Sequence, residues 1–129
     1  MRQGRARGSL QRRRQAERRG RAAEWLCCWS LRLRGWRIVE RGWRCPAGEI
    51  DILARRGRVL AVIEVKSRGQ VEDAAAALTR RQRRRIARAA QAFLQARPDL
   101  GVLDLRFDVM LVTRHRLPRH WPGAWQAES

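Results

Sequence analysis

The sequence predicts an α/β domain whose mixed β-sheet is covered by helices on both faces, and three observations support this prediction. Two stretches of helical periodicity frame three consecutive β-type segments, and a fourth β-type segment follows the second helix. This order of elements is typical of α/β domains. The segments at 49–55 and 58–66 are apolar on both faces, as the central strands of a helix-covered sheet are. A chain of 129 residues has room for one such domain and not for two.

The chain begins with a basic stretch that is nearly free of apolar residues and cannot form a core. We therefore expect residues 1–14 to be a disordered basic arm. Residues 15–125 should form the single domain, and residues 126–129 a short tail.

The first helix is expected to begin between Leu10 and Arg18 and to run to about Arg34. Gly35 follows, and glycine is the residue that most often ends a helix. Apolar residues recur in this segment at the spacing of one helix face. The predicted buried face is Ala22, Trp25, Leu26, Trp29 and Leu33.

The next three segments predict strands. Residues 36–44 alternate imperfectly between polar and apolar side chains, and the CPAG sequence after them predicts a turn. Two β-branched runs around a glycine predict a hairpin, with strand 49–55, a turn at Arg56 and Gly57, and strand 58–66. The predicted faces are Ile50, Ile52, Ile63 and Val65 on one side and Leu53, Leu60 and Val62 on the other.

The second half of the chain predicts a helix and a strand. Residues 69–78 are expected to form a loop or a short helix, and Thr79 is a suitable N-cap for a helix to about Arg97. The inner stripe of this helix is predicted as Ile86, Ala90, Phe93 and Leu94. Arginines crowd its other side: Arg80, Arg81, Arg83, Arg84, Arg85 and Arg88. Residues 102–112 predict the fourth strand, and residues 115–125 are expected to be irregular, with two docked tryptophans.

The charge of the chain indicates an anionic partner. Thirty Lys and Arg residues against twelve Asp and Glu residues give a formal net charge of +18, and the only lysine is Lys66. A surface with this charge favours nucleic acid or an anionic membrane. Genomic base composition would explain the excess of arginine over lysine equally well, but it does not explain the net charge.

Cysteine usage indicates a cytoplasmic protein. The three cysteines have no metal-ligand spacing, and the adjacent Cys27 and Cys28 are poor disulfide partners. The apolar run at 25–31 is too short for a membrane span or a secretion signal. A mitochondrial-type presequence is the weaker alternative.

Three of the few acidic residues lie inside the most apolar strands: Glu49, Asp51 and Glu64. Burying a carboxylate without a partner costs several kcal/mol, so such a residue indicates a cation, a hydrogen-bond network or chemistry. With a turn at Arg56 and Gly57, position 49 lies opposite 64 and position 51 opposite 62, and side-chain alternation places all three acids and Lys66 on one face. A three-residue loop would instead separate Asp51 from Glu64.

Two neighbouring carboxylates require a cation or a proton between them, because at about 4 Å they repel by about 4 kcal/mol at an effective dielectric near 20. Carboxylate oxygens together with waters are the ligands that Mg²⁺ prefers, and Mn²⁺ is the substitute to test. Beside the ammonium group of Lys66, such an ion can activate water for attack on phosphate. Glu24 is in place to join from the first helix, or it is an ordinary surface residue. The plainer alternative for Asp51 and Glu64 is ion pairing with arginines.

These residues resemble a known family. Glu24 in GRAAE, Asp51 in GEIDIL, and Glu64 with Lys66 in VIEVKSR, followed by an arginine-rich helix and RFDVM, look like the YraN family of uncharacterised bacterial proteins over about residues 20–125. That family is similar to the PD-(D/E)xK nuclease superfamily, and most closely to archaeal Holliday-junction resolvases. The resemblance implies a restriction-endonuclease-like fold. It also implies that Asp51 and Glu64 are metal ligands, that Lys66 orients or activates the water, and that Glu24 is an auxiliary ligand.

Two positions depart from the family pattern. Gly42 stands where the family usually has Asn, and Arg81 where it usually has Lys, so a contact from either position is in question. The four acidic and basic site residues are all present.

The combined expectation is a Mg²⁺- or Mn²⁺-dependent DNA endonuclease that acts on structured or damaged DNA. The alternative is a non-catalytic nucleic-acid-binding protein on the same fold, and a third hypothesis is a basic RNA- or ribosome-associated protein without a site. No membrane contact is expected, and a homodimer is left open. The arginines expected on nucleic acid are Arg44, Arg68, Arg80, Arg81, Arg84 and Arg85.

Four other residues have simpler interpretations. Trp43 is expected in the core, with stacking on a base as the alternative. Asp108 is expected to be the structural partner of an arginine. His115 and His120 are expected to be tail residues without a catalytic role.

Overall fold

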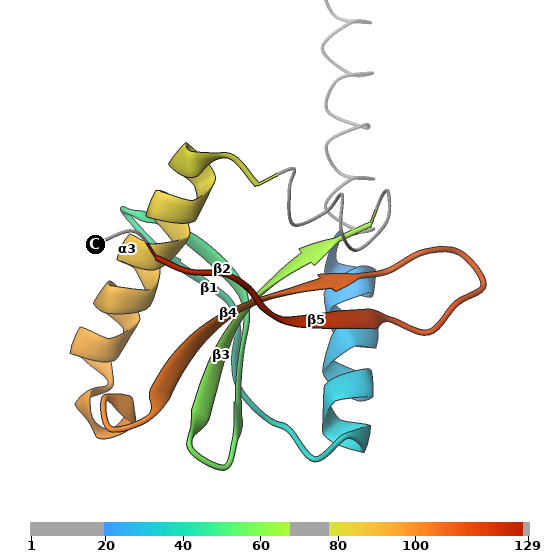
Figure 1. Cartoon of the computed structure of the whole chain (residues 1–129), viewed down its shortest axis with the longest axis horizontal. Helices are drawn as coiled ribbons and strands as arrows, with labels where there is room; N and C mark the ends of the chain where they lie inside the picture. Colours follow the sequence, from blue (N-terminus) through green and yellow to red (C-terminus); the bar gives the residue numbers. More distant parts are fainter. Residues whose placement is uncertain (1–19, 68–77, 128–129) are drawn as a thin grey trace, which may run out of the picture.

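The computed structural model describes residues 20–67 and 78–127 and contains one five-stranded sheet between two helices (Figure 1). Its elements are a helix over 20–33, β1 (Arg37–Cys45), β2 (Gly48–Arg56), β3 (Val59–Lys66), α3 (Arg80–Ala96), η1 (Pro98–Leu100), β4 (Asp104–Leu111) and β5 (Arg119–Trp125). The strand order is β1-β2-β3-β4-β5; β3 and β4 run parallel, and the other neighbours are antiparallel. The predicted α/β class is confirmed, and the architecture is consistent with a restriction-endonuclease-like fold.

Each face of the sheet has its own apolar core. The helix over 20–33 packs on one face in a cluster of Cys27, Cys28, Leu31, Trp36, Ile52, Ala54, Ala61, Ile63 and Met110. Helix α3 packs on the other face, where Ile86, Ala90 and Phe93 join the second cluster (Figure 1). Strands β2 and β3 contribute to both clusters, so the prediction of central strands covered on each side is confirmed.

Hydrogen bonds confirm the predicted end of the first helix and the predicted start of α3, whereas the predicted start of the first helix lies outside the described residues. Thr79 forms a capping box with Gln82, in which each side chain accepts a bond from the backbone N–H of the other residue. The last helical residue of the first helix is Leu33, and Gly35 follows in the terminating turn with a φ of 89°, which favours glycine. The N–H of Trp36 donates to the carbonyl of Leu31 at 2.9 Å, which closes the last turn.

The predicted buried face of the first helix is wrong. Its large members point to solvent: Trp25 is 52% exposed, Leu26 43%, Trp29 47% and Leu33 84%. The face that packs on the sheet consists instead of small residues and one leucine: Ala23, Cys27, Cys28 and Leu31. The helix carries two apolar stripes, and the stripe of small side chains lets it approach the sheet closely.

The predicted hairpin register is wrong by two residues. The turn consists of Gly57 and Arg58, so Ile52 pairs with Ile63 and Arg56 with Val59. A shift of two keeps every side chain on its predicted face, because the side-chain period of a strand is two. Ile50 is the exception, since it packs in the α3 cluster while Ile52 packs in the other. The alternation of side chains between the two faces of the sheet is therefore broken at Asp51, which lies between Ile50 and Ile52.

The segment predicted as an irregular tail contains strand β5. It pairs with β4 alone, and as an edge strand it tolerates Pro122. The predicted docking of its last tryptophan is confirmed, because Trp125 stacks on Phe107 with ring centroids 4.2 Å apart. The expected loop at 69–78 lies almost wholly outside the described residues, as do the predicted arm and the end of the tail.

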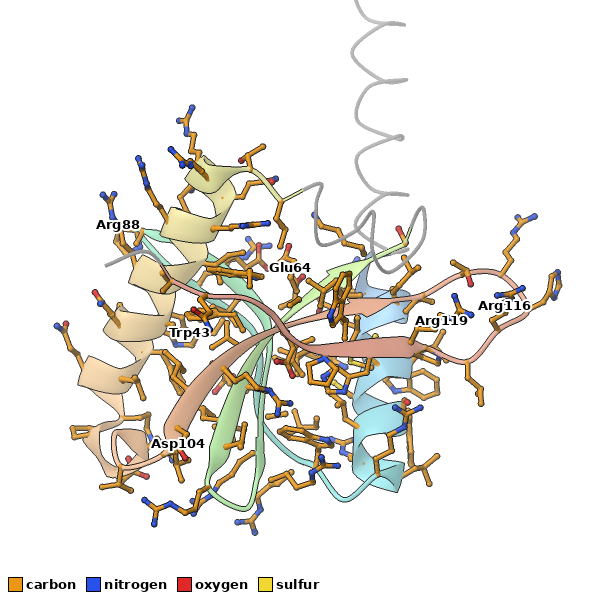
Figure 2. All side chains as sticks on the ribbon, in the orientation of Figure 1. Trp43, Glu64, Arg88, Asp104, Arg116 and Arg119 are labelled. Carbon is orange, nitrogen blue, oxygen red and sulfur yellow. The ribbon has the colours of Figure 1, made fainter. Side chains whose placement is uncertain are left out.

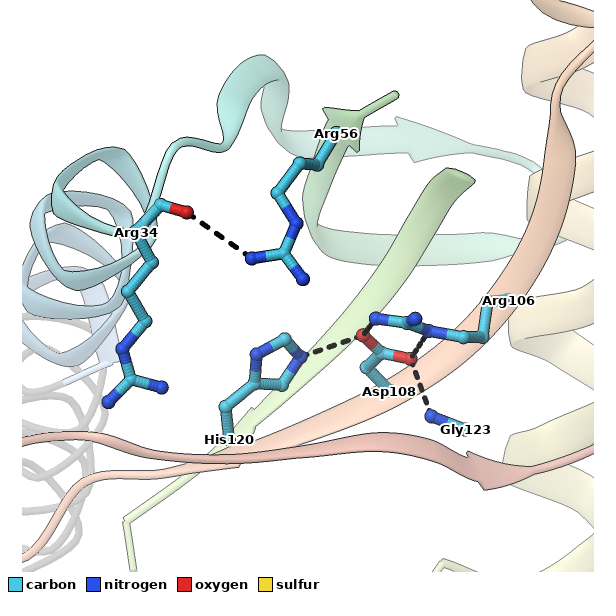
Figure 3. Close-up of polar contacts among 6 residues, drawn as sticks. All are labelled: Arg34, Arg56, Arg106, Asp108, His120 and Gly123. Carbon is cyan, nitrogen blue, oxygen red and sulfur yellow. Dashed lines mark hydrogen bonds and ion pairs between the residues drawn. The ribbon is translucent and has the colours of Figure 1, made fainter. Parts of the chain in front are cut away.

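A buried ionic anchor joins β5 to β4. Asp108 is fully buried and accepts two hydrogen bonds from Arg106 at 2.9 Å, one from His120 Nε2 at 2.7 Å and one from the N–H of Gly123 at 2.8 Å (Figure 3). The expected role of Asp108 as partner of an arginine is confirmed. His120 is a strand residue of this anchor and not part of an irregular tail.

Trp36 lies beside the same anchor. The guanidinium groups of Arg106 and Arg56 lie 5.5 and 4.6 Å from its ring centroid. Arg56 also donates to the carbonyl of Arg34 at 3.2 Å (Figure 3), which fastens the end of the first helix to β2.

We predict that Asp108→Ala lowers the free energy of unfolding by about 3 kcal/mol, because it leaves a partly buried guanidinium and a backbone N–H without their acceptor. Urea denaturation monitored by tryptophan fluorescence measures the change. Asp99→Ala is the matched control, since it removes an exposed Arg97–Asp99 pair, and it should leave the midpoint nearly unchanged. Equal midpoints for the two variants would contradict the anchor.

Candidate functional site

Asp51 lies where the two central strands separate. The β2–β3 pairing ends at Ile52 and Ile63, after which β2 continues beside β1 and β3 beside β4. The backbone N–H of Val65 donates to Asp51 Oδ2 at 2.9 Å. The Asp51 carboxylate thus satisfies a backbone donor at the fork between the strands, and this contact fixes its position.

Three carboxyl groups from three elements meet at this fork. Glu64 of β3 and Glu24 of the first helix each share a side-chain hydrogen bond with Asp51. Burial and the negative charge of Asp51 raise the pKa of Glu64 to about 8, and the same two causes raise the pKa of Glu24 to about 7. Burial also raises the pKa of Asp51, although the bond from Val65 opposes the rise. Near neutral pH the cluster therefore holds shared protons.

Lys66 and Glu49 lie beside this cluster. Lys66 Nζ is 3.8 Å from Glu64 Oε1, and its side chain is 29% exposed. Glu49 is drawn toward solvent, because Arg44 Nε lies 3.4 Å from its carboxylate and both side chains are well exposed. The structure therefore brings together Glu24, Asp51, Glu64 and Lys66, and leaves Glu49 at the edge.

A cavity of about 580 Å³ opens beside the cluster. Its lining combines carboxylates with arginines: Gly20, Arg21, Glu24, Arg41, Gly42, Arg44, Glu49 and Asp51. The positive groups can hold phosphate oxygens close to carboxylates that would otherwise repel them. The cavity is therefore suited to a phosphodiester.

Sequence reasoning missed Arg21 and Arg41 as cavity residues. Arg21 precedes Glu24 by three positions on the helix, and this spacing was a usable signal. Arg41 is opposite Ile52, next to Asp51, and no local pattern reveals that pairing. Gly42 has a φ of 63°, a left-handed conformation that glycine adopts without strain.

The donor chemistry of the cluster fits a divalent cation. In the described part of the chain, no three His, Cys, Asp or Glu side chains form a group that could hold a metal ion as they stand. Mg²⁺ needs only one or two protein carboxylates, because it retains several waters. Asp51 and Glu64 would hold it, and its positive charge would take the place of the shared protons and offset the repulsion between the two carboxylates.

Most arginines of α3 form a second basic surface, on its outer side (Figure 2). Arg83, predicted on that side, is instead half-buried, with its guanidinium 5.9 Å from the ring centroid of Trp125. A cavity of about 430 Å³ there is lined by Pro46, Ala47, Arg81, Arg84, Arg85 and Arg88. Arg85 donates to the carbonyl of Ala47 in the β1–β2 turn at 3.4 Å. Glu49, two residues after Ala47, lines the cavity of about 580 Å³ beside the carboxyl groups, called the carboxylate cavity below. The β1–β2 turn therefore connects this cavity to the basic surface of α3.

The arginines expected to contact nucleic acid are exposed wherever the structure describes them. They are Arg44, Arg80, Arg81, Arg84 and Arg85, whereas Arg68 lies outside the described residues. Trp43 packs edge to face against Phe93 with ring centroids 5.4 Å apart, which supports its core role. Among the helices that the structure describes, none is long and apolar enough to cross a membrane.

Comparison with known proteins gives one consistent family. Residues 23–112 match the family described as uncharacterised protein family UPF0102. The chain is 52% identical over 111 residues to a UPF0102 protein of Parvibaculum lavamentivorans, covering 86% of this chain and 84% of that protein. It is 48% identical over 117 residues to one of Paramagnetospirillum magneticum (88% and 91%), and 48% over 110 residues to one of Nitrobacter winogradskyi (85% and 93%).

We predict that the metal-free protein loses stability as the pH rises. The raised pKa values of Glu24 and Glu64 mean that, between about pH 4.5 and 8, the folded chain holds protons that the unfolded chain has released. Their contribution is fully present below pH 4.5, the ordinary pKa of a glutamate, and is lost toward pH 8, on the order of 2 kcal/mol.

Melting temperatures in a chelating buffer across this pH range test the prediction. Glu64→Gln should flatten the fall, whereas Glu40→Gln, which changes an exposed acid on β1, should leave it unchanged. Added Mg²⁺ should restore stability at the alkaline end. A metal-free melting temperature that stays level or rises with pH would contradict the shared protons.

Proposed function

We propose that this chain, which belongs to the uncharacterised protein family UPF0102, is a Mg²⁺- or Mn²⁺-dependent endonuclease that cuts structured or damaged DNA. This family is the YraN family whose motifs the sequence resembles, so that resemblance is confirmed. The observation that carries the proposal is the fork between β2 and β3. There, Asp51 and Glu64 share a hydrogen bond, and the only lysine lies 3.8 Å from Glu64.

The residues of the fork divide the chemistry of phosphodiester hydrolysis among them. Asp51, held by the N–H of Val65, and Glu64 present oxygen donors from two strands. A divalent cation bound to them would supply positive charge to the phosphate oxygens and lower the pKa of a water molecule. Lys66 places a compact ammonium group beside the same phosphate, where it can orient the attacking water. Glu24 holds a proton near neutral pH and can exchange it with Asp51.

The substrate proposal is supported by charge. A net charge of +18 and the arginines of α3 and the carboxylate cavity favour a phosphate backbone. The described cysteines are free thiols, which supports a cytoplasmic location. The sequence and the structure leave a homodimer open.

A non-catalytic nucleic-acid-binding protein is the second candidate. It is favoured by one observation, namely that the described carboxylates form no group ready to hold a metal ion. A basic protein without any site is disfavoured, because such a protein has no need of three costly carboxyl groups in one place.

We predict that Asp51→Asn and Glu64→Gln each abolish cleavage and Mg²⁺ binding while DNA affinity stays equal or rises slightly, because each change removes an ionisable carboxyl group and adds no negative charge facing phosphate. Linear, branched and single-stranded DNAs with Mg²⁺ or Mn²⁺ form the cleavage panel, and calorimetry measures metal binding. Glu40→Gln is the control and should behave as the unchanged protein. Full Mg²⁺ affinity in both site variants would refute the metal site. Metal binding without cleavage of any DNA would favour the second candidate.

We predict that Lys66→Arg damages cleavage nearly as much as Lys66→Ala, by about 100-fold or more. A guanidinium is broad and planar and stays protonated, so it supplies charge without fitting where the ammonium group lies. Both variants are assayed at saturating Mg²⁺ on whichever DNA is cut. Activity of Lys66→Arg within about threefold, or roughly 0.7 kcal/mol of barrier, would mean that the position needs only positive charge.

A further inference from the structure

The outer face of the first helix carries two neighbouring tryptophans that the core does not use. Trp25 and Trp29 are 52% and 47% exposed, and their ring centroids lie 5.9 Å apart at an interplanar angle of 73°. Leu33, one turn further on, is 84% exposed. Single exposed apolar residues need no explanation, but an aromatic pair on one stripe indicates a contact surface.

The charge around these rings is positive. Arg21 stands one turn before Trp25, and the guanidinium of Arg32 lies 5.8 Å from the ring centroid of Trp29. Glu24 is the only acid within residues 20–33, and its carboxyl group joins the cluster on the sheet side. The outer face therefore suits an anionic partner. A second copy of a chain with a net charge of +18 does not provide one.

We propose that Trp25 and Trp29 form a stacking platform for unpaired bases of a nucleic acid strand. Bases stack on exposed aromatic rings whatever their identity, and each stacked base strengthens binding by about 5- to 160-fold. The faces of paired bases are hidden inside a duplex. The platform therefore selects single-stranded segments, which frayed, branched or damaged DNA exposes.

The position of the platform links it to the carboxylate cluster. Arg21 lines the cavity that contains Glu24 and Asp51, and it lies on the same side of the helix as Trp25. A strand whose phosphates enter this cavity passes Arg21 before it reaches the rings. This link rests on the proposed function, and it favours nucleic acid over an anionic membrane, which a basic helix with exposed tryptophans also suits.

The test compares single-stranded with duplex binding in the full-length chain. Fluorescence anisotropy with labelled oligothymidylate and with a blunt duplex of equal length is measured in chelator at one salt concentration. Trp25→Ala with Trp29→Ala should lose about 20-fold or more on the single strand and less than twofold on the duplex. The slope of affinity against salt should not change, because no charge is removed.

Two control variants separate stacking from apolar contact. Trp25→Phe with Trp29→Phe should keep most of the single-strand affinity, because a ring remains at each position. Leu33→Ala removes exposed apolar surface from the same face and should have little effect. All variants should melt at nearly the temperature of the unchanged protein, since the replaced side chains point to solvent.

Three results would overturn the platform. The first is single-strand affinity of the double alanine variant within twofold of the unchanged protein, or an equal loss on the duplex. The second is unchanged nucleic acid affinity with lost binding to phosphatidylglycerol vesicles, which would assign the face to a membrane. The third is conversion of a dimer to a monomer in sedimentation analysis. None of these experiments measures cleavage. The platform can therefore be correct if the nuclease proposal is wrong, and it can be wrong while the Asp51→Asn variant behaves as predicted.

Discussion

The site depends on the hydrogen bond from the N–H of Val65 to the carboxylate of Asp51. When two sheet strands separate, the backbone donors of their inner edges lose their partners, and a buried donor must find another acceptor. Asp51 supplies it from the neighbouring strand. The same contact fixes Glu64 and Lys66, because they flank Val65 on β3. The acid at the fork therefore has a structural role, and the proposed chemistry would use the same group.

Close packing of the first helix completes the cluster. Ala23, Cys27 and Cys28 present small side chains to the sheet, and Glu24, beside them, reaches Asp51. Large residues on this face would hold the helix, and its carboxyl group, further from the fork. Packing the small stripe inward leaves the tryptophans of the same helix outside. The geometry that builds the carboxylate cluster thus also produces the exposed aromatic face.

The surface of this small domain and the fork between β2 and β3 have opposite kinds of charged group. The surface is strongly cationic and attracts a polyanion, whereas the fork concentrates carboxyl groups that share protons because they cannot all ionise. A cation bound at the fork would replace the shared protons of the carboxyl groups, and its charge would also attract phosphate. The anchor at Asp108 is the contrast. There burial would raise the pKa of the carboxyl, but hydrogen bonds from His120 and Arg106 outweigh burial and lower it, so the group stays ionised as a structural element.

The sequence by itself determined the order and type of most elements, their caps and the acids of the site. Thr79 and Gly35 act locally, so local pattern was enough to predict them. The predicted hairpin register differs from the observed one by two residues. The prediction still placed Asp51 and Glu64 on the same face, because the side-chain alternation of a strand repeats every two residues. The tertiary structure decided what depends on a partner far along the chain. It selected the stripe of small residues on the first helix, turned residues 119–125 into an edge strand, and ended the β2–β3 pairing at Ile52, next to Asp51. In each case two arrangements satisfy the local pattern equally, and only close packing and the pairing of distant backbone groups distinguish them.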